Sequence, residues 1–440
     1  MPPAPGPPVA AGRDRVVSGP GAERTRVATL PTGARVLTQT APAARSATIG
    51  FWVLVGSRDE APGQHGSTHF LEHLVFKGTR QRSAQAIAEA FDAVGGEFNA
   101  STTKESTCYY ARVLAEDVGL AVELLADMVT SSRLDRLDFE NERGVILEEL
   151  AMNADDPVDV AHEALAAAVF GPHPLARPIA GRPEDIRAVS RDQVWDHYQQ
   201  RYQPPALAVT GTGAVDPDGF AQLVSQALAA GGWGLADRGA APPQARRPTR
   251  PQVALPAQGA ARALAKPTEQ AQVLVGCEGL AASDPRRHAM SVLGAVLGGG
   301  MSSRLFQEIR EKRGLAYSTY CFGAPHSDAG LFGLFAGCGP AAAEEVGRLM
   351  EAEWERLAAS GVSPDELARA KGQLRGATLL GLEEPYAAMN RLGWAEIMMG
   401  ELPSIDEVAA RIEAVTAAQV QSLAAELAAR PRCRVVVGPA

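Results

Sequence analysis

The sequence predicts an α+β protein of two related domains, each a mostly antiparallel sheet with helices packed on one face. Strand-like apolar runs alternate with amphipathic segments of helical period, and short turns connect them. The same order of patterns occurs twice along the 440 residues, which indicates an internal duplication. Hydrophobic residues make up 46% and charged residues 21%, so each domain has enough apolar residues to bury a core.

The first half contains an apolar run from Ala47 to Val55, which predicts a strand that precedes a helix. A Gly-Gly turn and a Thr- and Tyr-rich strand pattern from Glu97 to Val113 follow, and then a helix from Gly119 to Thr130. This half closes with a helix from Gln193 to Tyr202 and a strand from Ala206 to Thr210. Such alternation is typical of a sheet covered by helices.

The second half repeats this order of strands and helices. Its predicted elements are a strand at Ala271–Cys277, helices around 284–312, strands at Leu315–Phe322 and Gly330–Cys338, a helix at 341–358, a helix at Ala418–Ala429 and a strand at Cys433–Val437. Between the halves, residues 236–256 are rich in Pro, Ala and Arg without periodicity, which indicates a linker. Domains are therefore predicted at 24–235 and 257–440, preceded by a flexible Pro-rich tail at 1–23.

Charge, apolar runs and cysteines narrow the function classes. Lys and Arg number 42 against 51 Asp and Glu, a net charge of −9, so a nucleic-acid partner is not expected. No run reaches 18 apolar residues and the Pro-rich start lacks a secretory signal, so neither a membrane span nor secretion is expected. The five scattered cysteines favour a reducing, cytoplasmic location and leave any transition metal to His and carboxylate ligands.

The segment from Gly66 to Gly78 carries the strongest chemical signal. Ser67 or Thr68 can act as an N-cap and Gly78 as a stop, so the segment is predicted to be a short helix. The alternative is an ordinary surface helix whose polar residues are solvated. The pattern of histidines and glutamate inside the segment favours a functional helix.

Within this helix, His69 and His73 are four residues apart. They therefore lie on one face, one turn apart, and are close enough to bind one metal ion. Glu72 lies on the same side, where a carboxylate can accept a proton from a water at the metal without being a ligand. His65 precedes the helix and is interpreted as a loop residue, not as a ligand.

A catalytic zinc ion takes three protein ligands, so a third must come from elsewhere in the chain. A second helical pattern at 139–150 contains the candidates Glu142, Glu148 and Glu149. Glu142 and Glu149 share a helix face two turns apart, so one can bind the metal while the other supports a ligand. Spacing alone does not separate Glu148 from Glu149, and a solvated helix face is the alternative for each.

The motif His69-Phe-Leu-Glu72-His73, with Glu149 seventy-six residues after His73, resembles the insulinase/pitrilysin family of zinc metallopeptidases, the inverzincins. That family includes the mitochondrial processing peptidase, and the resemblance covers about residues 25–435. It implies the mitochondrial processing peptidase-like metallohydrolase fold. It also implies Glu149 as the third zinc ligand, Glu142 as a supporting residue and Glu72 as the general base. The second half has no H-x-x-E-H, so one Zn²⁺ per chain is expected.

The resemblance also implies a peptide-binding surface in the first half. The run Phe98-Asn99-Ala100-Ser101 resembles the edge strand on which the family binds its peptide substrate through backbone hydrogen bonds. Phe76 matches an apolar residue near the substrate-binding pocket. The alternatives are an ordinary exposed strand for this run and helix core packing for Phe76.

In the second half, Arg310 and Tyr317 resemble the family's Arg/Tyr element. The resemblance implies that the tyrosine hydroxyl donates to the oxyanion of the tetrahedral intermediate and that the arginine holds a substrate carbonyl. Judged from the residues alone, Arg310 is a helix cation and Tyr317 a residue of an amphipathic strand.

These observations predict a zinc-dependent endopeptidase that cleaves extended or unfolded peptides. The family encloses its substrate between four such domains and this chain supplies two, so a homodimer is expected, with a heterodimer with a related chain as the alternative. Another class of function is a non-catalytic scaffold subunit of a related complex. A third interpretation, a maturation protease for one precursor, differs only in its substrate.

Overall fold

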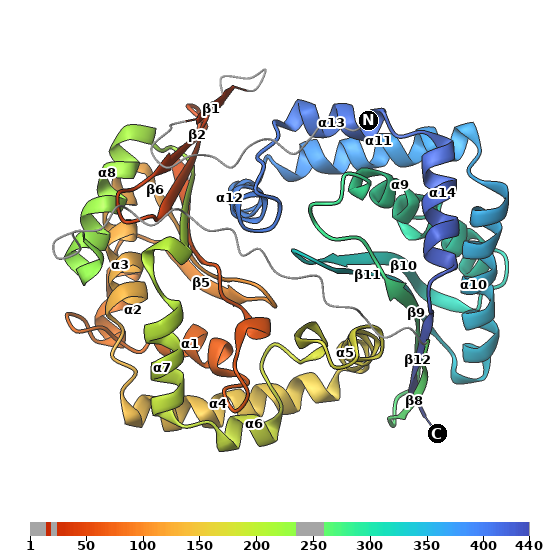
Figure 1. Cartoon of the computed structure of the whole chain (residues 1–440), viewed down its shortest axis with the longest axis horizontal. Helices are drawn as coiled ribbons and strands as arrows, with labels where there is room; N and C mark the ends of the chain where they lie inside the picture. Colours follow the sequence, from red (N-terminus) through yellow and green to blue (C-terminus); the bar gives the residue numbers. More distant parts are fainter. Residues whose placement is uncertain (1–14, 19–23, 235–258, 440) are drawn as a thin grey trace. The chain divides into compact units, whose positions relative to one another are not determined.

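The computed structural model describes residues 15–18, 24–234 and 259–439, and the statements below concern these residues (Figure 1). They belong to two compact units. Unit 1 takes the described residues within Met1–Ile146, Ile179–Thr249 and Leu382–Ser404, and unit 2 those within Leu147–Pro178, Arg250–Gly381 and Ile405–Ala440. Each unit thus includes one segment from the other half of the sequence. The linker predicted at 236–256 lies outside the described residues.

Unit 1 contains a seven-stranded sheet in the order β1-β2-β3-β7-β4-β6-β5. Its strands are β1 (Arg15–Ser18), β2 (Arg24–Thr29), β3 (Arg35–Thr40), β4 (Ser46–Val53), β5 (Glu97–Thr102), β6 (Thr107–Leu114) and β7 (Leu207–Gly213). Only β3 and β7 pair in parallel. Strand β1 falls within the predicted tail, whose other residues are not described, and it pairs with β2. The pattern at Glu97–Val113 is a hairpin of two strands, because the chain turns back at residues 103–106.

Unit 2 contains a five-stranded sheet in the order β10-β11-β9-β12-β8. Its strands are β8 (Ala261–Ala265), β9 (Ala271–Glu278), β10 (Ala316–Pro325), β11 (Gly330–Cys338) and β12 (Cys433–Gly438). Again one pair is parallel, β12 with β8, and the others are antiparallel. The order repeats the series β5-β6-β4-β7-β3 of unit 1, which agrees with the predicted relation between the domains.

Helices surround both sheets. Those of unit 1 are α1 (Ser67–Val75), α2 (Ala84–Ala93), α3 (Val118–Ser131), α6 (Pro183–Ala188), α7 (Arg191–Arg201), α8 (Pro217–Leu228) and α12 (Pro385–Trp394). Those of unit 2 are α5 (Pro157–Phe170), α9 (Arg287–Gly298), α10 (Ala343–Ser360), α11 (Pro364–Gly381), α13 (Ile405–Glu413) and α14 (Ala417–Ala428). Helix α4 (Arg136–Asp155) begins in unit 1 and continues into unit 2.

The sheet of unit 1 is covered on two faces. Trp52 of β4 and Ala208 of β7 pack with Met389 of α12, which is blue in Figure 1. Gly211 lies three residues after Ala208 and so on the opposite face, where it meets Phe220 of α8.

The sheet of unit 2 follows the same plan. Val273 and Val275 of β9 belong to the core formed with α9, α10 and α14. The intervening Leu274 packs with Leu165 of α5 on the other face. The α+β class and the mostly antiparallel sheets are confirmed, but the prediction of helices on one face is incomplete. The physical reason is that the central strands β4, β9 and β11 are buried along almost their whole length.

Three helices begin at an acidic residue followed by proline: Asp156 before α5, Asp216 before α8 and Glu384 before α12. In each case the acidic side chain accepts a hydrogen bond from a backbone N–H of the first turn. Proline suits this turn because it has no N–H that needs a partner. These local signals determine where α5 and α12, the helices on the second faces, begin.

Among the helices that the structure describes, none combines the length and the apolar character that crossing a bilayer requires.

Candidate metal centre

Helix α1 starts at a glycine and not at a capping side chain. Its N-cap is Gly66, at φ 86°, so the predicted N-caps Ser67 and Thr68 are wrong; both are buried inside the helix. Glycine suits this position because φ is left-handed and a Cβ would meet Ile186. The carboxylate of Glu60 caps the helix from outside, accepting hydrogen bonds from the N–H groups of Gly66 (2.9 Å) and Thr68 (2.8 Å). The helix ends at Val75, three residues before the predicted stop at Gly78.

The two histidines of α1 lie on one face, as their spacing predicts. His69 is buried and His73 is partly exposed, and their ring centroids are 4.8 Å apart with the rings inclined at 71°. His65 lies in the turn before the helix, with its Nδ1 3.7 Å from a carboxylate oxygen of Asp185. The geometry of one helical turn thus brings two imidazoles together without help from distant residues.

Helix α4 packs against α1 and carries Glu149, the third candidate metal ligand. Phe70 of α1 stacks on Phe139 of α4 with ring centroids 4.6 Å apart. The ligand atoms offered by His69, His73 and Glu149 all lie within 4.8 Å of one another. In the described part of the chain, this is the one group of three or more His, Cys, Asp or Glu side chains arranged to hold a metal. Glu148, which spacing could not distinguish from Glu149, is exposed and outside the group.

Glu142 contacts this group through His73. Its carboxylate accepts a hydrogen bond from Nδ1 of His73 at 2.9 Å and pairs with Nζ of Lys77 at 2.7 Å. Burial opposes ionisation of Glu142, but the hydrogen bonds from Lys77 and His73 outweigh it and lower the pKa of this carboxyl. An ionised Glu142 holds the proton of His73 on Nδ1, so Nε2 carries the lone pair that a metal needs.

This donor set fits zinc. Two imidazoles and one carboxylate are the ligands of a catalytic zinc site with a position for water. All five cysteines are unpaired thiols. Burial raises the pKa of Cys338 to about 11 and that of Cys277 to about 12, and it also raises the pKa of Cys108 and Cys321. These four thiols are therefore protonated at neutral pH and poor metal ligands.

Glu72 precedes His73 in α1 and is partly exposed. It is not a member of the His69, His73 and Glu149 group, and its role as the general base stays a prediction. Burial raises the pKa of Tyr109 of the neighbouring sheet, and Tyr202 and the negative charge of Glu72 raise it further.

Strand β5 forms the edge of the sheet in unit 1, because it pairs only with β6. Phe98 stacks on Phe91 of α2, and Ala100 shares its face of the strand, whereas Asn99 and Ser101 are exposed. Phe76 follows α1, with its ring centroid 5.7 Å from that of Phe98. The edge position of β5 is as the resemblance implies, and the role of Phe76 and of these strand residues in peptide binding stays a prediction.

Arg310 and Tyr317 are adjacent in unit 2. Nη1 of Arg310, in a π-helical turn at Phe306–Glu311, donates to the carbonyl oxygen of Tyr317 at 2.8 Å. The guanidinium also lies 4.5 Å from the centroid of the Tyr317 ring, which is 74% exposed at the start of β10. The pair is therefore preorganised and open to a ligand, and its action at the metal stays a prediction.

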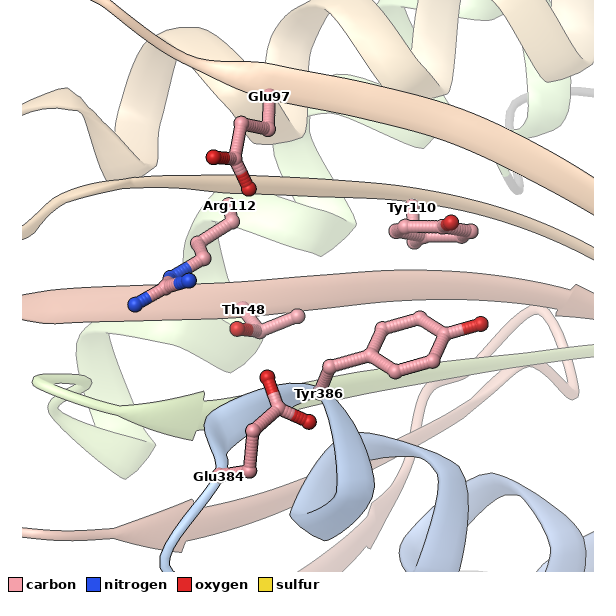
Figure 2. Close-up of a pocket in the computed structure, with 6 residues that line it drawn as sticks. All are labelled: Thr48, Glu97, Tyr110, Arg112, Glu384 and Tyr386. Carbon is pink, nitrogen blue, oxygen red and sulfur yellow. The ribbon is translucent and has the colours of Figure 1, made fainter.

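A hollow of about 190 Å³ lies on the α12 face of the sheet in unit 1, and its lining side chains are drawn in Figure 2. Its lining residues come from β4, β5, β6 and the start of α12: Thr48, Glu97, Tyr110, Arg112, Glu384 and Tyr386. Burial and the hydrogen bond with Tyr386 raise the pKa of Tyr110 to about 12, so the phenol of Tyr110 stays neutral at neutral pH. None of these side chains belongs to the His-His-Glu group, so the hollow adds no donor atom to it.

Two residues that position α1 were missed from the sequence. Glu60 caps the helix, and His197 of α7, only 1% exposed, lies with Nε2 3.2 Å from Oγ1 of Thr68. Local signals do not identify such partners, since His197 is 129 residues away in the chain. Its burial, together with the charge of Arg201, lowers the pKa of His197 to about 4.

This pKa predicts acid sensitivity of the fold. Between pH 6.5 and about 4 the unfolded chain protonates His197 and the folded chain does not, so stability falls as pH is lowered through this window. The loss is at most about 3 kcal/mol. Urea unfolding of chelator-treated protein at about pH 7.5 and about pH 4.5 measures it, beside His197→Gln. We expect a weaker pH dependence in the variant, and equal dependence in both proteins would contradict the assignment.

Two stretches of the chain match described protein families. Residues 35–182, which contain the two histidines, Glu72 and Glu149, match "Insulinase (Peptidase family M16)". Residues 188–374 match "Peptidase M16 inactive domain". The motif-bearing half and the motif-free half of the chain thus match different descriptions within one peptidase family.

Bacterial proteins resemble the chain over nearly its full length. A protein named as an uncharacterized zinc protease from Streptomyces coelicolor is 47% identical over 416 residues, 94% of this chain and 89% of that protein. One so named from Mycobacterium tuberculosis is 42% identical over 94% of this chain and 93% of its own length. One from Bacillus subtilis is 33% identical over 93% of this chain and 97% of its own length.

Two solved structures share the fold. A structure titled as a peptidase M16 inactive domain from Pseudomonas fluorescens aligns with a TM-score of 0.85 at 20% identity, over 94% of this chain and 98% of that one. A protease from Helicobacter pylori aligns with a TM-score of 0.85 at 22% identity, over 98% of this chain and all of that one.

Proposed function

This chain belongs to the insulinase family, peptidase family M16, and we propose that it is a zinc-dependent endopeptidase that cleaves extended or unfolded peptides. The observation that carries the proposal is the His69, His73 and Glu149 group, with ligand atoms within 4.8 Å, on helices α1 and α4. The Glu142 carboxylate on Nδ1 of His73 supports it, since an acid–histidine pair of this kind typically orients a metal-binding imidazole.

Each residue has a defined task in this proposal. His69, His73 and Glu149 would hold one ion per chain, and a bound zinc ion supplies Lewis-acid chemistry for carbonyl polarisation and water activation. Glu72 takes a proton from the attacking water and returns it to the leaving amine. Tyr317 donates its hydroxyl hydrogen to the developing oxyanion.

Substrate binding follows from the edge of the sheet. The exposed edge of β5, with Asn99 and Ser101 outward, can add a peptide as a further antiparallel strand, which selects for extended conformation and not for sequence. Phe76 offers an apolar surface at the end of α1, and Arg310 offers its remaining donors to a substrate carbonyl. A folded substrate has no free strand to donate, so unfolded peptides are the expected class.

Metal analysis and peptide digestion of one preparation test the proposal. The full chain should retain about one zinc ion and cleave a mixture of unstructured peptides. Cleavage should stop on addition of a chelator and return with added zinc. A folded chain that binds no metal and cleaves no peptide would instead identify the alternative, a scaffold subunit of a related complex.

We also propose a homodimer in which the second half of one subunit completes the site of the other. A Glu72→Gln chain mixed with a Tyr317→Phe chain would then form hybrid dimers with one intact site each. Random exchange should restore roughly a quarter of wild-type activity. Absence of rescue after verified exchange would contradict a shared site.

The five free thiols support a reducing compartment, so a cytoplasmic location is part of the proposal. Cell fractionation tests it, and recovery of the chain from the medium would contradict it.

A further inference from the structure

One short segment, residues 56–60, lies in the connection from β4 to α1 and contacts two parts of the proposed site. Its 3-10 turn Ser57–Asp59 lies against the turn that connects β5 to β6. The N–H of Ser57 donates to the carbonyl of Thr103 at 3.2 Å, and that of Arg58 to the carbonyl of Lys104 at 3.0 Å. Gly56 permits this approach, because a Cβ there would overlap the backbone of Lys104 and Glu105.

A buried ion pair strengthens the contact with the hairpin. Nη1 of Arg58 lies 2.7 Å from Oε1 of Glu105, and these side chains are only 7% and 3% exposed. Removal of one partner from such a pair leaves a buried charge unpaired, so the two groups stay together. Glu105 lies in the turn that ends β5, so this pair connects the segment to the edge strand.

The other end of the segment contacts the start of α1. The carboxylate of Glu60, 5% exposed, accepts from the N–H of Gly66 with one oxygen and from that of Thr68 with the other. Thr68 directly precedes His69. Because a helix is rigid over one turn, the position of its first N–H groups sets the position of both histidines. The negative charge is also favourable at a helix N-terminus.

We propose that residues 56–60 are a positioning bridge. Glu60 orients the metal-binding helix α1, and the Arg58–Glu105 pair fixes the position of the edge strand β5 relative to α1. The inference rests on the proposed function, since it assigns ligands to α1 and substrate to β5. Only Asp59 separates Arg58 from Glu60 in the chain, so the two contacts allow little relative movement. The segment therefore sets where a peptide on β5 lies relative to the two histidines.

Two matched variants separate the two contacts, because Glu60→Gln and Glu105→Gln make the same change at two buried carboxylates. Glutamine at position 60 keeps one acceptor but turns an N–H₂ donor toward a backbone N–H. We expect Zn²⁺ affinity, measured by competition with a chromophoric chelator, to fall about 10–100-fold in Glu60→Gln and to change less than about twofold in Glu105→Gln.

Peptide binding should show the opposite pattern. It is measured without turnover in zinc-loaded chains that carry Glu72→Gln, as the Kd of a fluorescent unstructured peptide. Glu105→Gln should raise this Kd up to about tenfold, the loss expected for one misplaced backbone hydrogen bond. Glu60→Gln, once saturated with zinc, should raise it less.

The bridge is overturned if both variants lower metal affinity equally, or if Glu60→Gln binds zinc like the parent chain. A parent chain that binds no zinc would instead overturn the proposed function. Hydrogen exchange on the unaltered protein covers the case in which a variant fails to fold. The amides of Gly66 and Thr68 should exchange as slowly as those of the β4–β6 ladder, and exchange as fast as exposed turns would also overturn the bridge.

Discussion

Glu72→Gln is expected to lower kcat about 10²–10⁴-fold while the metal content of the chain stays unchanged. Glutamine has nearly the shape of glutamate but cannot accept a proton from water at neutral pH. Because Glu72 is outside the His69, His73 and Glu149 group, its replacement removes the base and leaves the ligands in place. Steady-state cleavage of a fluorogenic peptide, with metal measured in the same samples, tests this expectation.

Glu148→Gln is the matched control for this prediction. Glu148 is an exposed residue of α4 with the same side chain, so its replacement should change kcat less than about twofold. Equal activity of Glu72→Gln and the parent chain would remove Glu72 from the mechanism. Loss of metal from Glu72→Gln would make it a ligand and not a base.

Glu149→Gln is expected to lower zinc affinity by more than about 100-fold. Loss of an outer partner such as Glu142 typically costs about 10–100-fold, and loss of a direct ligand should exceed that range. Competition with a chromophoric chelator gives the three affinities. The expected order of effect is Glu149→Gln, then Glu142→Gln, with Glu148→Gln close to the parent chain.

That order can fail in two informative ways. If Glu148→Gln loses the metal and Glu149→Gln keeps it, α4 presents its Glu148 face to the two histidines and not its Glu149 face. If Glu142→Gln loses as much affinity as Glu149→Gln, then Glu142 contributes a bond of its own and not only the hydrogen bond to Nδ1 of His73.

Much of the fold could be predicted from local patterns. Strand β11 has the predicted bounds Gly330–Cys338, and α3 extends only one residue beyond the predicted Gly119–Thr130 at each end. These elements have a clear period and strong turn signals at both ends. The helices on the second faces, α5 and α12, could not be placed, because an apolar strand indicates burial and does not identify the distant segment that covers it.

The site residues that depend on local helix geometry could also be predicted, and those that depend on packing between distant segments could not. His69 and His73 could be paired because helical geometry alone brings residues four apart together. Glu148 and Glu149 differ by about 100° around α4, so only the packing of that helix, through Phe70 and Phe139, selects between them. Glu60 was missed because α1 begins at a glycine, which gives no sign of the carboxylate that caps it.

X-ray absorption at the zinc edge of the loaded chain tests the ligand set most directly. Two imidazoles and a carboxylate predict Zn–N and Zn–O distances of about 2.0–2.2 Å, with the multiple-scattering pattern of two histidines. His73→Gln should reduce that pattern to one histidine. A shell at about 2.3 Å, the Zn–S distance, or a site unaffected by His73→Gln would contradict the metal centre on α1 and α4.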